Sequence, residues 1–470
     1  MAFDYQVVVI GAGPGGYVCG IRLAQLGLKC AVVEKQYWGG TCLNVGCIPS
    51  KVLLDASHLY HHIKEVAPEQ GIVVGEVKVD LKKLNQHKLN IVKRLTGGVK
   101  LLLEKNGADL IFGAASFVDP HTLEITTPEG KSQRITAEKF VVATGSTYRT
   151  LPGLGIDGKR VISSDEGIDP TDFPQRLLVI GGGYIGMELG SVYNALGAEV
   201  VVVEFLPEIL ATLDQDIRKE AAKLFKRQGI EIRTNTKVTQ VKTTSKGVKV
   251  TMEPAAEGGF AGSESFDKVL VAVGRVPNTE DLALDRAGVK VDEKGFVVVD
   301  EHLTTSQPHI YAIGDVIGGA MLAHKASHEG YQLAEKLAGN WAHFDFTVPA
   351  AVFTFPEIAY VGMTEEEAKE KGHEIKTGKF SFGANGRALS LGEADGFVKV
   401  IGDAKTDELL GVHIIGPHAS DLINEATMAL LFGASCEDFQ AAVRIHPTLG
   451  EAVHEAALGV DGKMIHAINR

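Results

Sequence analysis

One stretch near the start of the chain, YQVVVIGAGPGG at residues 5–16, decides the fold. The β-branched run Tyr5–Ile10 predicts a short strand, and the glycines after it predict a tight turn. The apolar segment Tyr17–Leu26 predicts a helix that Gly27 ends, and the valine-rich run Lys29–Glu34 predicts a second strand. Strand, helix and strand in this order form a βαβ unit, which indicates a parallel sheet.

The glycine turn has the spacing G-x-G-x-x-G, which is typical of dinucleotide binding. Gly11 permits the turn, Gly13 lets a pyrophosphate approach the backbone, and Gly16 lets the helix pack on the strand. The helix N-terminus then directs free N–H groups at the phosphate. Glu34 ends the next strand, where a carboxylate can accept hydrogen bonds from ribose hydroxyls. The alternative is a simple βα turn with a surface glutamate.

The same arrangement returns as GGGYIG at residues 181–186, with Glu204 at the end of the following strand. Gly11 to Gly181 and Glu34 to Glu204 both span 170 residues, so we expect two separate nucleotide-binding domains. A carboxylate at Glu204 suits a free 2′-hydroxyl and repels a 2′-phosphate. The next basic residue along the chain is Arg218, so no nearby arginine is available for a phosphate. We therefore expect FAD in one site and NAD, rather than NADP, in the other.

The composition is that of a globular protein of about three domains. Of the 470 residues, 45% are hydrophobic and 23% are charged, which excludes a mostly disordered chain. The net charge of −12 argues against nucleic-acid binding. The first residues do not have the basic pattern of a signal or transit peptide, and the longest uncharged run, Tyr5–Ile21, is broken by glycines. We therefore expect a soluble, cytoplasmic protein.

The rest of the chain mixes helix-like and strand-like segments. Helix is expected over Lys51–Glu65 and onward to Asn106, and strands are expected over Leu110–Ile135. The runs FVVATG (140–145) and VLVAVG (269–274) predict strands that end in turns. Towards the C-terminus, Val348–Val361 and Gly378–Gly416 alternate like antiparallel strands, and residues 421–432 and 447–458 are helix-like.

Two of the five cysteines directly follow the first βαβ unit, in GGTCLNVGCIPSK at residues 39–51. Cys42 and Cys47 are close enough in sequence to form a bridge, and a strained, accessible disulfide is catalytic rather than structural. Lys51 and a nearby helix start would lower the pKa of a thiolate. The alternatives are a buried thiol pair or two metal ligands, but no second ligand pair is nearby and we expect no metal. The other cysteines are expected to be inert core residues: Cys19, Cys30 and Cys436.

These motifs, together with AIGD at residues 312–315, resemble those of the flavin-dependent disulfide oxidoreductases. The resemblance covers essentially the whole chain. It implies an α/β fold with two Rossmann-like dinucleotide-binding domains, for FAD and NAD, and a C-terminal α+β dimerisation domain. The implied segments are an FAD-binding domain (1–147), an NAD-binding domain (148–275), the second part of the FAD/central domain (276–346) and an interface domain (347–470).

The resemblance also implies which residues bind the cofactors. For FAD they are Gly11, Gly13, Gly16, Glu34, Gly40, Thr41, Lys51, Gly113, Thr144, Gly145, Ser146, Asp315, Met321, Leu322, Ala323 and His324. For NAD they are Gly181, Gly183, Gly186, Glu188, Glu204, Val238 and Gly274. In the family, the acid at the position of Glu188 pairs with the lysine at the position of Lys51, beside the flavin ring.

His446 and Glu451, in HPTLGE, resemble the histidine–glutamate dyad of the family. A base is chemically required, because a dithiol must lose protons before a thiolate can attack a disulfide. The carboxylate would orient the imidazole and stabilise its cationic form. Arg444 stands where the family often has a second histidine, and we expect it to alter fine tuning rather than the base itself.

Among the activities of the family, the resemblance indicates NAD-dependent oxidation of dihydrolipoamide within 2-oxoacid dehydrogenase complexes. Dihydrolipoamide would attack Cys42, leaving Cys47 as a thiolate against the flavin, and His446 would accept the proton. The family's base comes from the partner subunit, which implies a homodimer with an active site shared across the interface. The expected partners are lipoyl domains and the acyltransferase component of the complex, with no nucleic acid and no membrane.

Other activities of the same fold are the main alternatives. An enzyme like glutathione reductase, acting on another small disulfide, would prefer NADP, which Glu204 opposes. Mercuric reductases and large thioredoxin reductases carry a C-terminal cysteine pair, and the last residues here, MIHAINR (464–470), contain none. A non-enzymatic docking role is an alternative of another class. The presence of Cys42, Cys47, His446 and Glu451 together argues against it.

Overall fold

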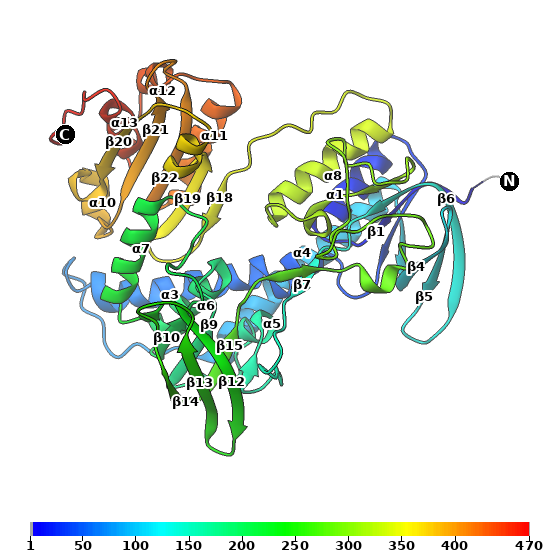
Figure 1. Ribbon diagram of the computed structural model, residues 1–470, viewed down its shortest axis with the longest axis horizontal. Helices are drawn as coiled ribbons and strands as arrows, with labels where there is room; N and C mark the ends of the chain where they lie inside the picture. Colours follow the sequence, from blue (N-terminus) through cyan, green and yellow to red (C-terminus); the bar gives the residue numbers. More distant parts are fainter. Residues whose placement is uncertain (1–2, 470) are drawn as a thin grey trace. The chain divides into compact units, whose positions relative to one another are not determined.

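The structure is a computed structural model in which residues 3–469 are described. These residues form two compact units. Unit 1 contains the residues up to 52, residues 82–149 and residues 274–345, and unit 2 contains residues 53–81, 150–273 and those from 346 onward. Each unit therefore gathers three segments that are far apart in the sequence, which can be followed by colour in Figure 1.

Unit 1 is built on a parallel sheet. Its parallel strands, in spatial order, are β3 (Asp109–Phe112), β2 (Cys30–Glu34), β1 (Tyr5–Ile10), β6 (Ser132–Val142) and β17 (Ile310–Ala312). The first half of β6 pairs antiparallel with β5 (Thr122–Thr126), which in turn pairs with β4 (Ala114–Asp119). Val7, Val8 and Val9 are fully buried, as expected for a central parallel strand that is covered on both faces.

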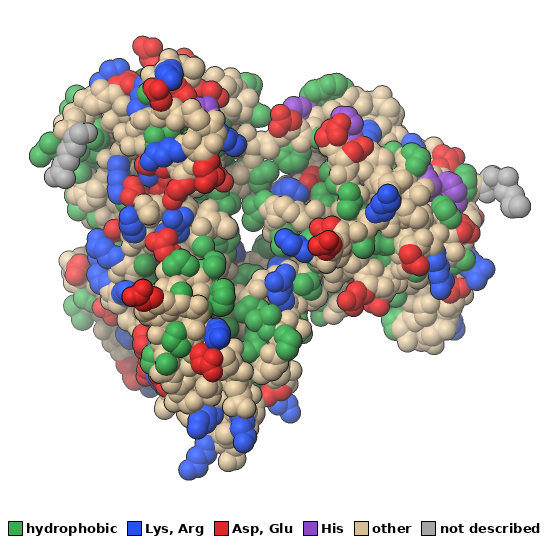
Figure 2. Space-filling model, viewed as in Figure 1, with side chains coloured by type: hydrophobic (Ala, Val, Ile, Leu, Met, Phe, Trp, Pro, Cys, Tyr) green, Lys and Arg blue, Asp and Glu red, His purple; other side chains and the backbone are tan. Residues whose placement is uncertain are grey.

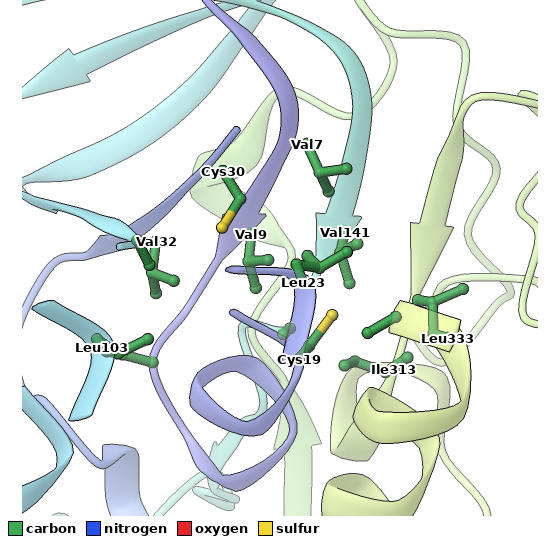
Figure 3. Close-up of a cluster of buried hydrophobic side chains, with 14 of the residues drawn as sticks. Val7, Val9, Cys19, Leu23, Cys30, Val32, Leu103, Val141, Ile313 and Leu333 are labelled. Atoms are coloured by element: carbon green, nitrogen blue, oxygen red, sulfur yellow. The ribbon is translucent and has the colours of Figure 1, made fainter. Parts of the chain in front are cut away.

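Three long helices accompany this sheet: α1 (Pro14–Gln25), α4 (Leu81–Asn106) and α8 (Ala323–Leu337). α1 and α8 lie side by side (Figure 1). Figure 3 shows the core against one face of the sheet, to which each helix contributes: Val7, Val9, Leu23, Leu103 and Leu333. This packing sets the position of the glycine turn between β1 and α1.

Further elements belong wholly or partly to unit 1. They are α2 (Gly40–Val45), α3 (Cys47–His61), the antiparallel pair β7 (Ser146–Tyr148) and β16 (Arg275–Pro277), and the 3-10 turns η2 (Glu280–Leu282) and η3 (Gly314–Ile317). α3 begins in unit 1 and ends in unit 2, where it continues into the π-helical turn η1 (His62–Val66).

Unit 2 contains a second parallel sheet, which has five strands. Its strands, in spatial order, are β11 (Glu231–Arg233), β10 (Glu199–Val203), β9 (Arg176–Ile180), β15 (Lys268–Val271) and β8 (Val161–Ile162). The helices of this region are α5 (Ser164–Gly167), α6 (Tyr184–Ala195) and α7 (Gln215–Arg227). A separate antiparallel sheet contains β12 (Thr236–Thr244), β13 (Gly247–Pro254) and β14 (Gly262–Phe266).

The C-terminal part of unit 2 is an antiparallel sheet with helices. Its strands, in spatial order, are β18 (Ala350–Val352), β19 (Glu357–Gly362), β22 (Leu409–Gly416), β21 (Phe397–Asp403) and β20 (Ile375–Ser381). The helices are α9 (Glu365–Glu370), η4 (Phe382–Ala384), α10 (Gly386–Leu391), α11 (Ala419–Leu431), α12 (Cys436–Ala441) and α13 (Gly450–Gly459). β21 and β22 are buried along their whole length and form the core of this part.

The predicted fold class is confirmed, because two parallel α/β sheets precede an α+β region. Two local predictions are wrong. The helix expected to continue from Glu65 to Asn106 is interrupted over residues 67–80. α10 interrupts the strands expected over Gly378–Gly416, because the Asn385 side chain accepts a hydrogen bond from the N–H of Ala388 and begins a helix there. The four predicted domain segments stay a prediction.

Two further observations concern the molecule as a whole. Across the described residues, no helix has both the length and the apolar character needed to span a membrane. Figure 2 shows one face, on which acidic and basic side chains are interspersed. The net negative charge of the chain is therefore not gathered into one acidic patch on this face.

Candidate redox and dinucleotide-binding sites

The first glycine turn, between β1 and α1, requires glycine at two positions. Gly11 has a φ of +106°, and a Cβ there would collide with the carbonyl oxygen of Ala143. A Cβ on Gly16 would collide with the carbonyl oxygen of Gly11. A side chain at either position would therefore push α1 away from the sheet. Gly13 is the N-cap of α1 and has no side-chain acceptor, so the first N–H groups of the helix remain for a phosphate.

Glu34, the last residue of β2, is held beside this turn by backbone donors. Its Oε2 accepts a hydrogen bond from the N–H of Ala12 at 2.7 Å. Its Oε1 accepts from the N–H groups of Gln36 and Tyr37, at 2.7 and 3.0 Å. The side chain is buried. A carboxylate fixed in this way still has lone pairs for the hydroxyls of a ribose.

A cavity of about 390 Å³ opens beside Glu34 within unit 1. This volume lies in the range of ~300–1,000 Å³ that is usual for small-molecule sites. Four of the residues predicted to bind FAD line the cavity: Gly11, Glu34, Gly113 and Thr144. Other residues that line the cavity were not predicted from the sequence, among them Lys35, Thr147 and Asn278. The first glycine turn thus faces a partly open cavity of suitable size.

Two sets of hydrogen bonds hold the loops around this cavity. The Thr144 hydroxyl donates to the carbonyl of Asn278 at 2.8 Å, and the Asn278 amide donates to the carbonyl of Thr144 at 3.0 Å. The Ser146 hydroxyl donates to Oδ2 of Asp315 at 2.5 Å, and Arg275 donates to the hydroxyl and the carbonyl of Ser146, both at 2.7 Å. The structure therefore brings the predicted Thr144, Ser146 and Asp315 together through Asn278 and Arg275. Arg275 and Asn278, which were not predicted, lie in the sequence GRVPN (274–278), which begins with the predicted Gly274.

The segment that leads to the cysteine pair covers the first glycine turn. The N–H of Gly39 donates to the carbonyl of Ala12 at 2.9 Å. Gly40 has a φ of +63°, and a Cβ on it would lie 2.5 Å from the Cα of Gly13. Glycine at position 40 is therefore needed for backbone to approach backbone here. The residues predicted to bind a phosphate at this turn thus directly contact those that precede Cys42.

Cys42 and Cys47 are thiols in contact with each other. Cys42 lies in α2, and Cys47 is the first residue of α3. Their hydrogen bond and the burial of the pair raise the pKa of Cys42 far above its usual value, while the charge of Lys51 opposes this rise. The side chains are half-buried, so a small substrate can reach them more easily than it can reach a core residue.

The three other cysteines are buried: Cys19, Cys30 and Cys436. Burial raises the pKa of the Cys30 thiol to about 11 and that of Cys436 to about 12. A thiol that stays protonated at neutral pH is a poor nucleophile. The expectation that these residues belong to the core is confirmed.

The second glycine turn, between β9 and α6, repeats the backbone of the first. Gly181 also has a φ of +106°, and a Cβ there would collide with the carbonyl oxygen of Ala272. A Cβ on Gly186 would collide with the carbonyl oxygen of Gly181. Gly183 is the N-cap of α6 and has no side-chain acceptor. A Cβ on Gly183 would meet no atom of the described residues within 4 Å, although the N–H of Leu210 donates to the carbonyl of the neighbouring Gly182 at 2.9 Å.

The carboxylate of Glu204, just after β10, accepts hydrogen bonds from backbone N–H groups, as the carboxylate of Glu34 does. Its Oε2 accepts from the N–H of Gly182 at 2.6 Å, and its Oε1 accepts from the N–H of Leu206 at 2.9 Å. The pairing of β10 with β11 also brings Arg233 next to Glu204, whose N–H donates to the Arg233 carbonyl at 2.9 Å. An arginine at this place was not expected from the sequence, because Arg233 is distant along the chain.

The guanidinium of Arg233 is engaged away from Glu204. It pairs with Glu231 at 2.7 Å and with Glu264 at 2.8 Å, and it lies 4.0 Å from the centre of the Phe260 ring. Its side chain is only 10% exposed. Arg233 is therefore not available to a 2′-phosphate, and the argument for NAD over NADP stands after the fold is taken into account.

His446 and Glu451 form a hydrogen-bonded pair near the C-terminus. Nδ1 of His446 lies 2.8 Å from Oε1 of Glu451, and the N–H of Thr448 donates to Oε2 at 2.9 Å. Burial acts to raise the pKa of Glu451, but the bonds from His446 and Thr448 outweigh it and lower that pKa. The ionised carboxylate orients the imidazole and leaves Nε2 for proton transfer. The imidazole is 83% exposed in the single chain.

Arg444 anchors the loop that carries His446. Its Nη1 donates to the carbonyls of Phe439 and Ala442, at 2.8 and 2.6 Å, and its Nε lies 3.3 Å from Glu425. The Arg444 side chain is 7% exposed. Arg444 thus positions the backbone before the base, and its expected effect on fine tuning stays a prediction.

The remaining predicted residues lie in several places. Ala323 and His324 begin α8, whose Glu329 accepts a hydrogen bond from the N–H of Gly314 at 2.8 Å and so fixes the AIGD loop. Glu188 is buried and accepts from the N–H of Phe353 at 2.9 Å. Its pairing with Lys51 stays a prediction. Val238 lies in β12 and packs against the hydrophobic core of unit 2.

Comparison with known protein families identifies the class of protein. Residues 5–330 match the model of the pyridine nucleotide-disulphide oxidoreductases, and residues 348–457 match the dimerisation domain of the same family. The chain therefore belongs to the pyridine nucleotide-disulphide oxidoreductase family. This confirms the family, the enzyme class and the C-terminal dimerisation domain that the motifs imply.

Individual relatives are similar over their whole length. The chain is 46% identical to the mitochondrial dihydrolipoyl dehydrogenase of Pisum sativum over 465 residues, which cover 98% of this chain and 93% of the relative. It is 47% identical to the dihydrolipoyl dehydrogenase of Thermus scotoductus over 471 residues, which cover 99% of each. Among solved structures, the HOCl-induced flavoprotein disulfide reductase RclA from Escherichia coli is similar with a TM-score of 0.86 and 28% identity, over 96% of this chain and 99% of that one.

Proposed function

We propose that this oxidoreductase is a dihydrolipoamide dehydrogenase, which oxidises dihydrolipoamide to lipoamide and reduces NAD⁺, with FAD as its prosthetic group. The observation that carries the proposal is the contact of Cys42 with Cys47 directly after the segment that covers the first glycine turn. Two relatives named dihydrolipoyl dehydrogenase, at 46% and 47% identity over nearly the whole chain, support this activity. The alternative is an enzyme like glutathione reductase, which Glu204 and the engaged Arg233 disfavour.

The residues of unit 1 fit FAD. The turn at Gly11–Gly16 and the N-terminus of α1 would bind the pyrophosphate, and Glu34 would bind a ribose through its carboxylate. The cavity beside Glu34 has the volume of a small-molecule site. When bound, FAD supplies a two-electron relay between the dithiol and the pyridine nucleotide. The turn at Gly181–Gly186 and Glu204 would bind NAD in the same manner.

Cys42, Cys47 and His446 carry the thiol chemistry. One thiolate of dihydrolipoamide attacks Cys42 of the oxidised pair, forms a mixed disulfide and releases Cys47 as a thiolate. The second substrate thiolate attacks the substrate sulfur of that mixed disulfide, so lipoamide leaves and Cys42 is released. His446 accepts the proton that the substrate thiol loses. Over the cycle, two electrons and one proton reach NAD⁺ as a hydride, and one proton goes to solvent.

The active form is a homodimer in which each active site draws on both chains. The dimerisation-domain match and the exposure of the base in the single chain support this. Large apolar side chains near the dyad in sequence and close to the C-terminus are also strongly exposed: Phe432, Val443, Ile445, Ile465 and Ile468. Exposed apolar side chains in such number mark a protein contact. The partner subunit's His446 then acts on the substrate at Cys42.

The physiological substrate is a lipoyl group carried by the acyltransferase component of a 2-oxoacid dehydrogenase complex. A lipoyl group on a flexible domain is a small disulfide, which suits a half-buried pair such as Cys42 and Cys47. The full-length similarity to two dihydrolipoyl dehydrogenases supports this assignment.

A comparison of two substrate pairs tests the activity. We expect rapid NADH formation from dihydrolipoamide and NAD⁺, and very slow turnover of glutathione disulfide with NADPH. Comparable rates for the two pairs would overturn the assignment.

A mixture of Cys42→Ser and His446→Ala chains tests the shared site. Each variant alone is inactive, and subunit exchange should restore up to about a quarter of the wild-type sites, because only mixed dimers rebuild one intact site.

A further inference from the structure

A second cluster of potential ligands lies in unit 2, outside the sites described above. His58 and His62 stand four residues apart at the end of α3, and Glu393 follows α10. One ligand atom from each of the three side chains lies within 4.8 Å of the other two. Within residues 3–469, this is the one group of three such side chains close enough together to share a metal ion.

The separations of these atoms already resemble those around a tetrahedral ion. Nε2 of His58 lies 3.2 Å from Oε1 of Glu393, and Nδ1 of His62 lies 3.6 Å from the same oxygen. Ligand atoms on a tetrahedral zinc ion, with bonds of ~2.0–2.1 Å, are ~3.3–3.4 Å apart. The distances from Oε1 of Glu393 to the two imidazole nitrogens therefore need little change to accommodate an ion. The distance between the two imidazole nitrogens is at most 4.8 Å and would shorten when an ion binds.

The polar atoms of this cluster are incompletely satisfied without an ion. Nε2 of His58 is shielded from solvent and makes no hydrogen bond with any residue that the structure describes. The Glu393 side chain is only 12% exposed. Buried polar groups are normally paired, and a cation between these atoms would satisfy both partners.

The two segments that carry the ligands are held in place by their surroundings. The ring of Phe355 packs 4.2 Å from the ring of His58. A Cβ on Gly392 would lie 2.6 Å from Cγ1 of Val66, so the backbone before Glu393 packs directly on the turn that contains His62. That turn is π-helical, a feature that often occurs at functional sites. The ligands are therefore preorganised before an ion binds.

We infer that His58, His62 and Glu393 form a binding site for a divalent cation of the zinc class, with solvent in the fourth position. Two imidazole nitrogens and one carboxylate oxygen are the donor set of zinc sites that keep an open position. The imidazoles are 40% and 31% exposed, so an ion and its water can enter from solvent. The ion would join the end of α3 to the segment after α10 within unit 2.

Calorimetric titration of the tag-free holoenzyme with ZnCl₂ tests the site. The enzyme is kept oxidised, so that the redox cysteines are joined in a disulfide and cannot bind zinc. We expect one zinc ion per chain and no competition from Mg²⁺, which prefers oxygen ligands. Loss of an outer-shell residue typically costs ~10–100-fold in metal affinity. Each of His58→Ala, His62→Ala and Glu393→Gln should therefore weaken zinc binding by ~100-fold or more.

His61→Ala is the matched control, because it removes an imidazole of the same helical turn that is not among the three ligands. This variant should bind zinc as the wild type does. Thermal unfolding gives a second measurement, in which zinc raises the midpoint for wild type and His61→Ala but not for Glu393→Gln. Wild-type affinity in Glu393→Gln, or an equal loss in His61→Ala, would overturn the assignment. Flavin absorbance without zinc shows that each variant is folded.

Discussion

The two glycine turns of this chain share one backbone geometry and differ in what covers them. Gly11 and Gly181 have the same φ of +106° and the same close carbonyl neighbour. Glu34 and Glu204 each accept a hydrogen bond from the backbone of the turn, at 2.7 and 2.6 Å. The chain therefore uses the same local backbone arrangement for binding a dinucleotide at both turns.

The difference lies beyond the turn itself. Backbone covers both turns, because the N–H of Gly39 donates to the carbonyl of Ala12 and the N–H of Leu210 donates to the carbonyl of Gly182, each at 2.9 Å. The backbone of Gly40 also packs directly against Gly13, whereas a Cβ on Gly183 would meet no atom of the described residues within 4 Å. Backbone packed closely on a turn favours slow exchange of its cofactor, and a wider space beside the turn favours binding and release in each cycle. The same motif can thus hold a prosthetic group at one place and a diffusing substrate at another, which suits FAD at the first turn and NAD at the second.

The largest effect is expected from one glycine substitution in each of the two turns. Gly11→Ala and Gly181→Ala both place a methyl group against a carbonyl, at a backbone conformation that alanine avoids. Gly11→Ala should yield protein without flavin and without activity. Gly181→Ala should keep its flavin, which dihydrolipoamide still reduces anaerobically, but form no NADH. The flavin-to-protein ratio and anaerobic spectra measure this, and loss of flavin from Gly181→Ala would contradict two independent turns.

A buried ion cluster joins the second turn's region to the C-terminal sheet. Nζ of Lys399 lies 2.7 Å from Asp214, 3.1 Å from Asp216 and 2.9 Å from Glu365. Lys399→Met leaves the fully buried Asp214 without its cation, which should cost about 3–5 kcal/mol of stability at pH 7. Urea unfolding followed by circular dichroism measures this. Lys405→Met, which removes an exposed partner of a glutamate, is the control and should cost less than about 1 kcal/mol.

This effect should depend on pH. Burial acts to raise the pKa of Asp214, but Lys399, His413 and the N–H of Glu365 together outweigh it, so the folded pKa lies below the unfolded value of 3.8. The unfolded chain then takes up the proton first, and the stabilisation is present above that pH and is lost as the pH falls. The difference between wild type and Lys399→Met should therefore shrink on acidification. A difference that grows towards acid pH would contradict the role given to the pair.

The smallest expected effect concerns the two ribose acids. Loss of a hydrogen bond to a charged group costs ~1.5–3 kcal/mol, which corresponds to ~10–100-fold in affinity. Glu204→Ala should raise the KM for NAD⁺ by this factor and leave the flavin content unchanged. Glu34→Ala should instead weaken flavin retention during dialysis, with an unchanged KM for NAD⁺ after FAD is added back. A rise in the KM for NAD⁺ in Glu34→Ala would contradict the assignment of Glu34 and Glu204 to two different sites.

Much of the candidate site could be predicted because its signals are local. The glycine turns, the acids after the strands, the cysteine pair and the His446–Glu451 dyad each involve residues within a few tens of positions of one another. Asn278, Arg275 and Arg233 could not be predicted in the same way. Arg275 reaches Ser146 because β16 pairs with β7, and Arg233 reaches Glu204 because β11 pairs with β10. The sequence does not state which strands pair.

The sequence by itself determined the class of fold, the two dinucleotide turns and the thiol pair, because backbone conformation at glycine and the order of strand, turn and helix depend on near neighbours. Only the tertiary structure decided that backbone packs closely on Gly13 of one turn but not on Gly183 of the other. It also decided that Arg233 is engaged, and that Glu393 meets His58 and His62. These features depend on segments that approach each other through the packing of helices and sheets, which no local pattern encodes.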